Sequence, residues 1–115
     1  TIQSITFGVI MGKPNVAASS LKIGLVQINN SFSGQNYLPY STGILQAYAL
    51  KFAKNPSRYE FLLPLYQREP LADALKRLEG AEIVFFSTYV WNMRYSLELA
   101  RRLKEKNPGV ITISI

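Results

Sequence analysis

Residues 85–113 constrain the fold more than any other part of this sequence. They read FFSTYVWNMRYSLELARRLKEKNPGVITI, in which two short runs of apolar residues enclose a segment with helical periodicity. The expected buried stripe of that helix comprises Ser96, Leu99, Ala100 and Leu103. Apolar and small residues at this spacing place one side of a helix against a sheet. The stretch therefore predicts a strand, a crossover helix and a second strand parallel to the first.

Four strands are expected from residue 21 onwards, including the two within the stretch just described. Residues 21–28, LKIGLVQI, form a nearly continuous apolar run, which is typical of a strand buried on both faces of a parallel sheet. Residues 59–65 predict the second strand, and Pro64 favours a place for it at the sheet edge. Residues 82–87 and 110–115 predict the third and fourth strands.

Two more helices are expected between these strands. The stripe predicted for the first helix is Leu45, Tyr48, Ala49 and Phe52, and the stripe predicted for the second is Leu71, Ala74, Leu75 and Leu78. Ser41 or Thr42 is expected to cap the first helix, and Asn92 to cap the helix within residues 85–113. Gly80 marks the end of the second helix.

This alternation predicts an α/β fold, namely a flavodoxin-like three-layer sandwich with parallel strand order 2-1-3-4, truncated before a fifth strand. Residues 21–115 would form this domain, and residues 1–20 an N-terminal extension or an added edge strand. In this strand order the loops after the first and third strands open side by side into one crevice, where α/β sheets bind ligands. The outer edge of the fourth strand would be unpaired, which favours self-association.

The absence of some residue types limits the chemistry. The sequence has no cysteine and no histidine, which excludes disulfides, thiolate nucleophiles, imidazole acid–base chemistry and most zinc sites. It contains no apolar run of about 18 residues, so no membrane span is expected. The N-terminal residues lack the basic start and apolar core of a secretory signal. A cytoplasmic location is the prediction.

The charged residues predict solvated helix faces. The net charge is +6, but lysines and arginines occur singly along the helices, apart from the pair Arg101 and Arg102. Glu98 is spaced to pair with Arg102 across one helical turn. Arg68 and Arg94 are expected to be ordinary surface residues. Because a nucleic-acid interface needs a clustered basic stripe, no nucleic-acid partner is predicted.

The two crevice loops carry groups that bind rather than react. Hydroxyls, amides and aromatic rings dominate them: Ser31, Ser33, Gln35, Asn36, Tyr37, Tyr40, Ser41 and Thr42 in the first, and residues 87–92 in the second. The only aspartate, Asp73, lies in the second helix, so the acidic cluster of a phospho-acceptor domain is missing. Neither GxGxxG nor GxxxxGK[ST] occurs. The loops favour a large, flat and partly polar ligand.

Three segments resemble a known family. YLPYSTGIL at residues 37–45, AEIVFFSTYVWN at residues 81–92 and KEKNPGVITI at residues 104–113 are similar to the cobalamin-binding domain of cobalamin-dependent radical S-adenosylmethionine enzymes. The resemblance covers about residues 22–115. It implies cobalamin across the carboxyl ends of the strands. The iron–sulfur cluster and S-adenosylmethionine would belong to a C-terminal barrel domain absent here, so this domain would not be catalytic alone.

The resemblance also implies which residues hold the corrinoid. One wall would comprise Tyr37, Leu38, Pro39, Ser41 and Gly43, and the other Ser87, Tyr89, Trp91 and Asn92. Gly43 has no Cβ, so the helix start could approach the corrin closely. Trp91 would be the bulky residue nearest the lower face of the cobalt. Corrinoid mutases carry DxHxxG after the first strand, and this chain does not, which implies cobalamin held without a histidine ligand.

Two other functions stay open at this point. SFSGQN at residues 31–36 resembles the phosphate loop of flavodoxins, and Tyr89 or Trp91 could stack on a flavin, which suggests an electron carrier that binds flavin mononucleotide. In that family, however, the loop runs directly into the helix, whereas YLPY intervenes here. The third hypothesis is a non-catalytic interaction domain that uses the exposed edge of the fourth strand.

Overall fold

The computed structural model describes residues 20–29, 31–32 and 35–115 of the 115-residue chain. The extension or edge strand predicted for residues 1–20 lies outside this part, apart from residue 20. Among the described residues, no helix has the length and apolar character that a membrane crossing requires.

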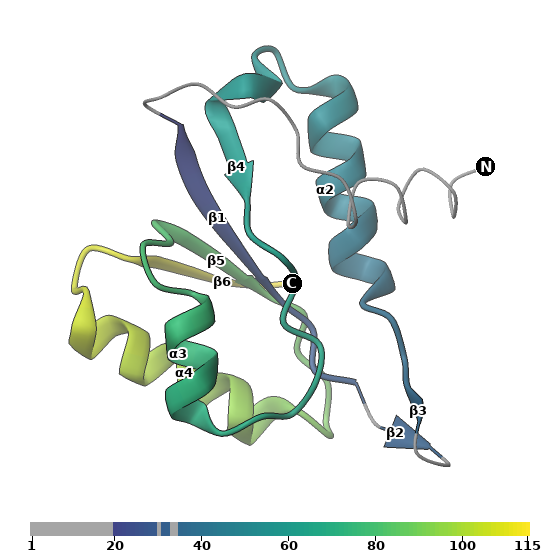
Figure 1. Cartoon of the computed structure of the whole chain (residues 1–115), viewed down its shortest axis with the longest axis vertical. Coiled ribbons are helices and arrows are strands. Elements are labelled where there is room, and N and C mark those ends of the chain that lie inside the picture. Colours follow the sequence, from purple (N-terminus) through teal and green to yellow (C-terminus); the bar gives the residue numbers. More distant parts are fainter. Residues whose placement is uncertain (1–19, 30, 33–34) are drawn as a thin grey trace.

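The centre of the fold is a parallel sheet of four strands. Its strands are β1 (Leu21–Val26), β4 (Tyr59–Phe61), β5 (Ile83–Phe86) and β6 (Ile111–Ser114), in the order β4-β1-β5-β6. In chain order this is 2-1-3-4, which confirms the predicted flavodoxin-like α/β topology (Figure 1). The second strand is shorter than the predicted residues 59–65, because β4 ends before Pro64, and it lies at the sheet edge, as the missing backbone donor of Pro64 favours.

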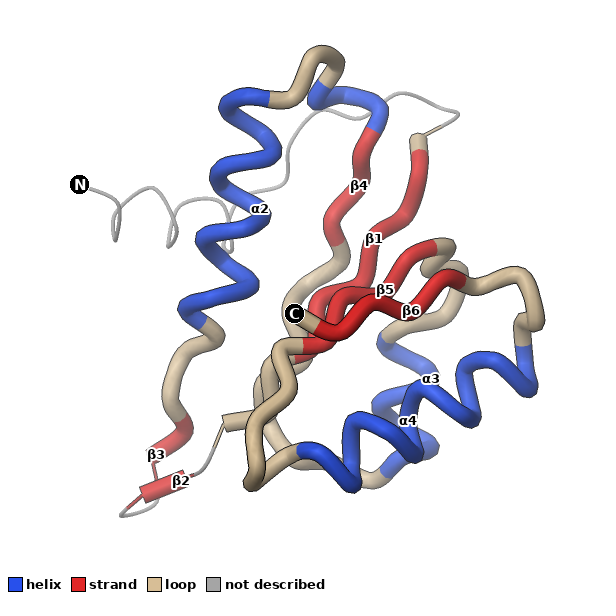
Figure 2. Tube along the Cα trace, turned by 180° about the vertical axis from the view of Figure 1, so that it is seen from behind, coloured by secondary structure: helices blue, strands red, loops and turns tan. Residues whose placement is uncertain are grey.

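Helices cover both faces of this sheet. The helices α3 (Leu71–Arg77) and α4 (Met93–Lys106) lie on one face, and α2 (Tyr40–Phe52) lies on the other (Figures 1 and 2). The chain therefore leaves β1 towards α2 on one face of the sheet and leaves β5 towards α4 on the other. Between them lies the switch point of the fold, where a crevice is expected.

Short elements fill the connections on either side of α2. A small antiparallel hairpin, β2 (Ser31–Phe32) and β3 (Gln35–Asn36), lies in the segment for which only a loop was expected. A 3-10 helix, η1 (Pro56–Arg58), leads from α2 into β4. The hairpin carries the chain away from the end of β1 before it returns to start α2 (Figure 1).

The main hydrophobic core lies between the sheet and the helices α3 and α4. Val84 and Phe86 face Leu78, Leu99 and neighbouring apolar side chains. The predicted stripe of α4 is confirmed, with Ser96, Leu99 and Leu103 buried and Ala100 packed against the core. The stripe of α3 is confirmed in the same way by Ala74, Leu78, Leu71 and Leu75.

Two glycines meet specific demands of this packing. A Cβ on Gly24 would lie 2.8 Å from Cδ2 of Leu78, the residue that follows α3, so a side chain at this position of β1 would force Leu78 to shift. Gly80 has φ +83° and lies just after α3, where the sequence predicted the helix end.

The buried face predicted for α2 is wrong. The buried residues of α2 are Thr42, Gly43, Gln46 and Ala47, whereas Tyr48 and Phe52 are 64% and 60% exposed. The reason is tertiary: small and polar residues face β1, where a large aromatic side chain would hold the helix away. Neither Ser41 nor Thr42 caps the helix, because its N-cap residue is Pro39, and the side chain of Gln27, just after β1, accepts the N–H of Thr42 instead.

The sheet is covered unevenly on the α2 side. On this face, Ile23 of β1, Ile83 of β5 and Ile111 of β6 are paired in one row across the sheet. The next row pairs Leu25, Phe85 and Ile113. Ile23 is buried, but Ile111 and Ile113 on β6 are 52% and 37% exposed. Helix α2 thus covers the β4–β1 half and leaves an apolar surface on the β6 half.

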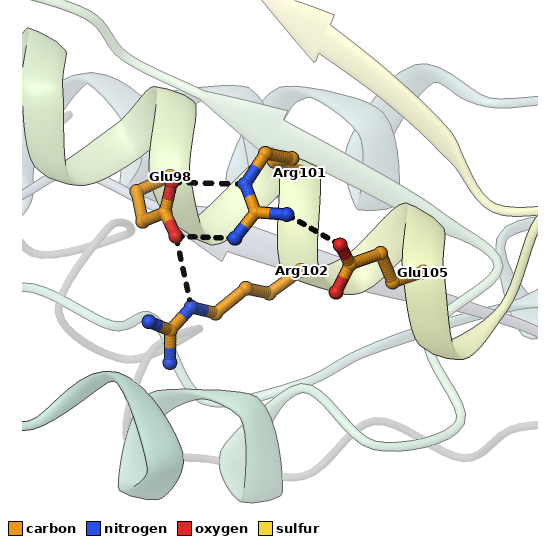
Figure 3. Close-up of polar contacts among 4 residues, drawn as sticks. All are labelled: Glu98, Arg101, Arg102 and Glu105. Carbon is orange, nitrogen blue, oxygen red and sulfur yellow. Dashed lines mark hydrogen bonds and ion pairs between the residues drawn. The ribbon is translucent and has the colours of Figure 1, made fainter.

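An ion-pair network lies on the exposed side of α4. The predicted pair is confirmed, with Arg102 Nε 3.0 Å from Glu98 Oε1, and Arg101 joins Glu98 to Glu105 (Figure 3). The hydrogen bond from Arg101, followed by that from Arg102, lowers the pKa of Glu98 from its ordinary 4.5 to about 2. Two arginines are thus engaged with glutamates on their own helix.

Candidate functional site

The two loops predicted to form a crevice meet at the carboxyl end of the sheet. The hydroxyl groups of Ser41, at the start of α2, and Tyr89, after β5, are 3.5 Å apart. Trp91 donates its indole N–H to the carbonyl oxygen of Ile28, which follows β1, at 3.1 Å. Segments separated by more than 40 residues therefore touch at the switch point between β1 and β5.

Tyr89 and Trp91 form a flat aromatic surface, which we call the Tyr89–Trp91 platform. Their rings are stacked, with centroids 4.6 Å apart and planes inclined by 5°. Trp91 is 44% exposed, and Tyr89 is half-buried. The hydrogen bond with Ser41, followed by that with Ser87, lowers the pKa of Tyr89 below its ordinary value. The platform is therefore held at its polar ends and open on its surface.

Asn92 lies beneath the platform and is fully buried. Its side-chain amide donates to the carbonyl oxygens of Ile28 and Ser87, each at 2.9 Å, and its Oδ1 accepts from the backbone N–H of Tyr89 at 2.8 Å. Asn92 is the N-cap residue of α4, as predicted, but its side chain makes no capping hydrogen bond to the helix. The same amide instead joins the end of β1 to the turn after β5.

Two side chains just after β1 hold the segment that leads into α2. Gln27 Oε1 accepts the backbone N–H of Thr42 at 3.1 Å, and the amide of Asn29 donates to the carbonyl oxygens of Tyr37 and Leu38 at 3.3 and 3.1 Å. Gln27 is buried. The sequence offered one signal for Gln27, a polar residue in an apolar run, but the run was interpreted only as a strand.

The nine predicted site residues lie in the segments that form this rim, and they separate by burial. Five of them reach solvent. Four are exposed and one, Tyr89, is half-buried; the exposed residues are Tyr37, Leu38, Ser41 and Trp91. The others form the layer beneath: Pro39, Gly43, Ser87 and Asn92 are buried. Only the exposed and half-buried residues are placed to touch a ligand that lies over the carboxyl ends of the strands.

A third loop supports the platform from the side of β4. Arg68 is exposed, as expected, but its Nη2 donates to the carbonyl oxygen of Trp91 at 2.7 Å, and its guanidinium carbon lies 5.4 Å from the ring centre of Tyr95. Tyr95 donates its hydroxyl to the carbonyl oxygen of Glu69 at 2.6 Å. No local pattern pointed to Arg68, because its partners lie more than 20 residues away.

The backbone at the start of α2 is engaged within the protein. Tyr40 N donates to Leu38 O, and Gly43 N donates to Pro39 O, both at 2.9 Å. The N–H of Thr42 is taken by Gln27. The bond of Gly43 is the first bond of the helix itself, so Tyr40 and Thr42 are the two N–H groups of the first turn that are used within the protein, which leaves fewer donors there for an anionic group.

The rim offers hydroxyl groups and aromatic rings to a ligand. Within the described residues, no group of three His, Cys, Asp or Glu side chains could hold a metal ion. A hollow of about 160 Å³ lies between α4 and the strands β5 and β6, and its mostly apolar lining includes Phe86, Leu97 and Ile113. This is below the roughly 300–1,000 Å³ of typical enclosed ligand pockets. The Tyr89–Trp91 platform offers a flat surface on which a flat ligand could lie.

Two curated proteins are similar to this chain, although no protein-family model matches it. One is a 2-(S-pantetheinyl)-carbapenam-3-carboxylate methyltransferase from Streptantibioticus cattleyicolor, and the other is the cobalamin-dependent radical SAM methyltransferase TokK from Streptomyces tokunonensis. Each is 27% identical over 78 residues, which are 68% of this chain and 12% of the relative. The chain thus spans about 12% of the length of the curated relatives it matches. The similarity supports a domain related to part of these enzymes.

Proposed function

We propose that this domain holds cobalamin over the carboxyl ends of β1 and β5, as one module of a cobalamin-dependent radical S-adenosylmethionine enzyme. The observation that carries the proposal is the Tyr89–Trp91 platform, an anchored and exposed pair of stacked rings at the switch point of the sheet. One of the two relatives that are 27% identical over 78 residues is named a cobalamin-dependent radical SAM methyltransferase. The module would bind the cofactor and would not be catalytic alone.

The residues at the rim fit a broad macrocycle with polar substituents. Aromatic faces of Tyr37, Tyr89 and Trp91, with Leu38, would give apolar contact, and Ser41 would offer a hydroxyl to peripheral amides. Pro39, Gly43, Ser87 and Asn92 would shape the layer beneath. Trp91 is the proposed residue nearest the lower face of the cobalt.

The chain contains no histidine, so none of its residues could give the cobalt an imidazole ligand. Bound cobalamin would supply the cobalt centre on which the activity named for the relative depends. The residues of this chain would orient the ring and cover one of its faces.

The proposed partner is the remainder of the same enzyme, a C-terminal barrel domain with an iron–sulfur cluster and S-adenosylmethionine. Val90 and Met93 are exposed beside the platform, so the rim offers apolar surface for a second domain above the cofactor. The exposed Ile111 and Ile113 at the β6 edge would pack against further protein or against a second copy. The proposal includes no nucleic acid and no membrane.

A titration with hydroxocobalamin tests the proposal directly. We expect the visible spectrum of the corrinoid to change in a saturable way. Because Trp91 is the only tryptophan of the chain, its fluorescence should be quenched in parallel. Flavin mononucleotide is the matched competitor, and we expect neither flavin quenching nor displacement.

The outcome distinguishes the hypotheses. Saturable binding of the flavin without corrinoid binding would replace the proposal by the electron-carrier hypothesis. The N–H groups of Tyr40 and Thr42 at the start of α2 are already used within the protein, which weighs against that outcome, because a flavin phosphate would need such donors. If neither ligand binds this chain or a longer chain that includes the following residues, the cofactor-binding proposal fails.

A further inference from the structure

We infer that Asn92 is a positioning residue: it holds the Tyr89–Trp91 platform against the end of β1 and thereby sets the shape of the crevice. The part of this inference that concerns the corrinoid rests on the proposed function. The part that concerns the platform itself does not.

The inference starts from one shared acceptor. The carbonyl oxygen of Ile28 accepts both the amide of Asn92 at 2.9 Å and the indole N–H of Trp91 at 3.1 Å. Ile28 is fully buried, as is Asn92. The end of β1 and the platform are therefore connected through a single oxygen atom whose surroundings exclude water.

Asn92 also fixes the turn that carries the two rings. Its amide donates to Ser87 O at 2.9 Å, and its Oδ1 accepts from Tyr89 N at 2.8 Å. These two bonds close residues 87–92 around the side chain. The turn and the β1 end are thus held by one planar group, and the tilt of the Trp91 ring relative to Ser41 depends on it.

The chemistry of the position favours asparagine over its near relatives. The side chain at this position must donate hydrogen bonds to two carbonyl oxygens and accept one from a backbone N–H, and it must be short enough to reach all three partners. Aspartate has a similar shape, but its ionised form only accepts and would face two carbonyl oxygens. Alanine would leave two carbonyl oxygens and one N–H buried without this partner. A role in contact with ligand would instead require an exposed amide.

The test uses Asn92→Asp and Asn92→Ala in the whole chain, with Asn107→Ala as the matched control. Asn107 lies at the opposite end of α4 and is exposed, and its Oδ1 accepts from Gly109 N. The fluorescence of Trp91 is measured without ligand, as emission maximum and as quenching by acrylamide. Affinity for hydroxocobalamin is measured separately, and circular dichroism checks the fold.

Both Asn92 variants should shift Trp91 emission to the red and raise acrylamide quenching about twofold, while the control keeps wild-type values. Corrinoid affinity should fall about fivefold or more, as expected for the loss of a buried hydrogen bond. Unchanged Trp91 emission and quenching in a folded Asn92→Asp variant would overturn the inference. If the unaltered chain binds no corrinoid, the proposed function fails, and the fluorescence results still decide the role of Asn92.

Hydrogen exchange in the unaltered chain covers the case in which both variants fail to fold. The side-chain amide protons of Asn92 should exchange slowly by NMR in the absence of ligand, because both are bonded to buried carbonyl oxygens. Exchange at the rate of an exposed asparagine, such as Asn107, would contradict the positioning role.

Discussion

Two aromatic pairs in this molecule have the same ring separation and different surroundings. The centroids of Tyr48 and Phe52 on α2 are 4.6 Å apart, as are those of Tyr89 and Trp91 at the rim. The planes of the helix pair are inclined by 39°, and those of the rim pair by 5°. The same separation between ring centres therefore goes with a tilted arrangement in one pair and a parallel stack in the other.

The difference lies in what holds each pair. Tyr48 and Phe52 meet because residues four apart are neighbours on a helix, and both are largely exposed. The rim pair is tied to Ser41 and Ile28, which belong to other segments of the fold. A pair anchored in this way is already ordered before a ligand arrives, so less conformational freedom is lost on binding. Anchoring, rather than exposure, thus distinguishes a candidate binding surface.

The largest expected effect is that of removing an anchor beneath the rim. Gln27→Ala leaves the N–H of Thr42 without its buried acceptor, and we expect the free energy of unfolding to fall by about 1–3 kcal/mol. The control Gln67→Ala removes an exposed glutamine and should change it by less than about 0.5 kcal/mol. Urea unfolding followed by circular dichroism measures both. Equal effects would mean that Gln27 is not an anchor.

The next prediction sets the two aromatic pairs against each other. Trp91→Ala should weaken hydroxocobalamin binding about tenfold, since it removes one ring of the anchored pair. Phe52→Ala removes a ring from the helix pair and should leave the affinity within about twofold. Absorbance titration at fixed ionic strength gives both values. Comparable losses in the two variants would show that the site lies elsewhere or that stability alone is affected.

A smaller effect is expected from the hydroxyl that meets the platform. The hydrogen bond with Ser41 stabilises the ionised Tyr89, so Ser41→Ala should raise the pKa of Tyr89 back towards its ordinary 10.0. Ultraviolet titration of tyrosinate, compared between Ser41→Ala and the exposed control Ser57→Ala, detects the change. An unchanged titration curve in Ser41→Ala would indicate that this contact is not formed in solution.

The smallest effect is expected far from both pairs, at Glu98. Its lowered pKa means that its stabilising contribution is complete above about pH 4.5 and is lost as the pH falls towards 2. Glu98→Gln should therefore lower the melting temperature slightly at pH 7, and the difference from wild type should shrink within that window. Because the network is exposed, added salt should reduce the difference too. The control is Glu79→Gln, and a larger shift in that variant would contradict the prediction.

Much of the architecture followed from local patterns in the sequence. The stripes of α3 and α4, the end of α3 at Gly80 and the edge position of the strand before Pro64 were all predicted and are confirmed. These features depend on periodicity and on backbone chemistry within a few residues. Strand order also followed, because right-handed crossovers leave few arrangements for such a series.

The meeting of the two rim loops was predictable for the same reason. Once β1 and β5 are neighbours and their chains leave to opposite faces, the segments after them must open together. The sequence placed Ser41 and Tyr89 on two walls of one crevice, and the structure brings their hydroxyl groups to 3.5 Å from each other.

Only the tertiary structure decided how these segments are held. The sequence by itself determined the strands of the parallel sheet, their order and the location of the rim. It did not determine the β2–β3 hairpin, the face that α2 buries, or the roles of Gln27, Asn92 and Arg68. Gln27 bonds to a residue 15 positions away, and Asn92 to one 64 positions away. Periodic patterns report which side of an element is apolar. A single polar contact between distant segments leaves no such repeat, so it becomes visible only when packing has brought the two partners together.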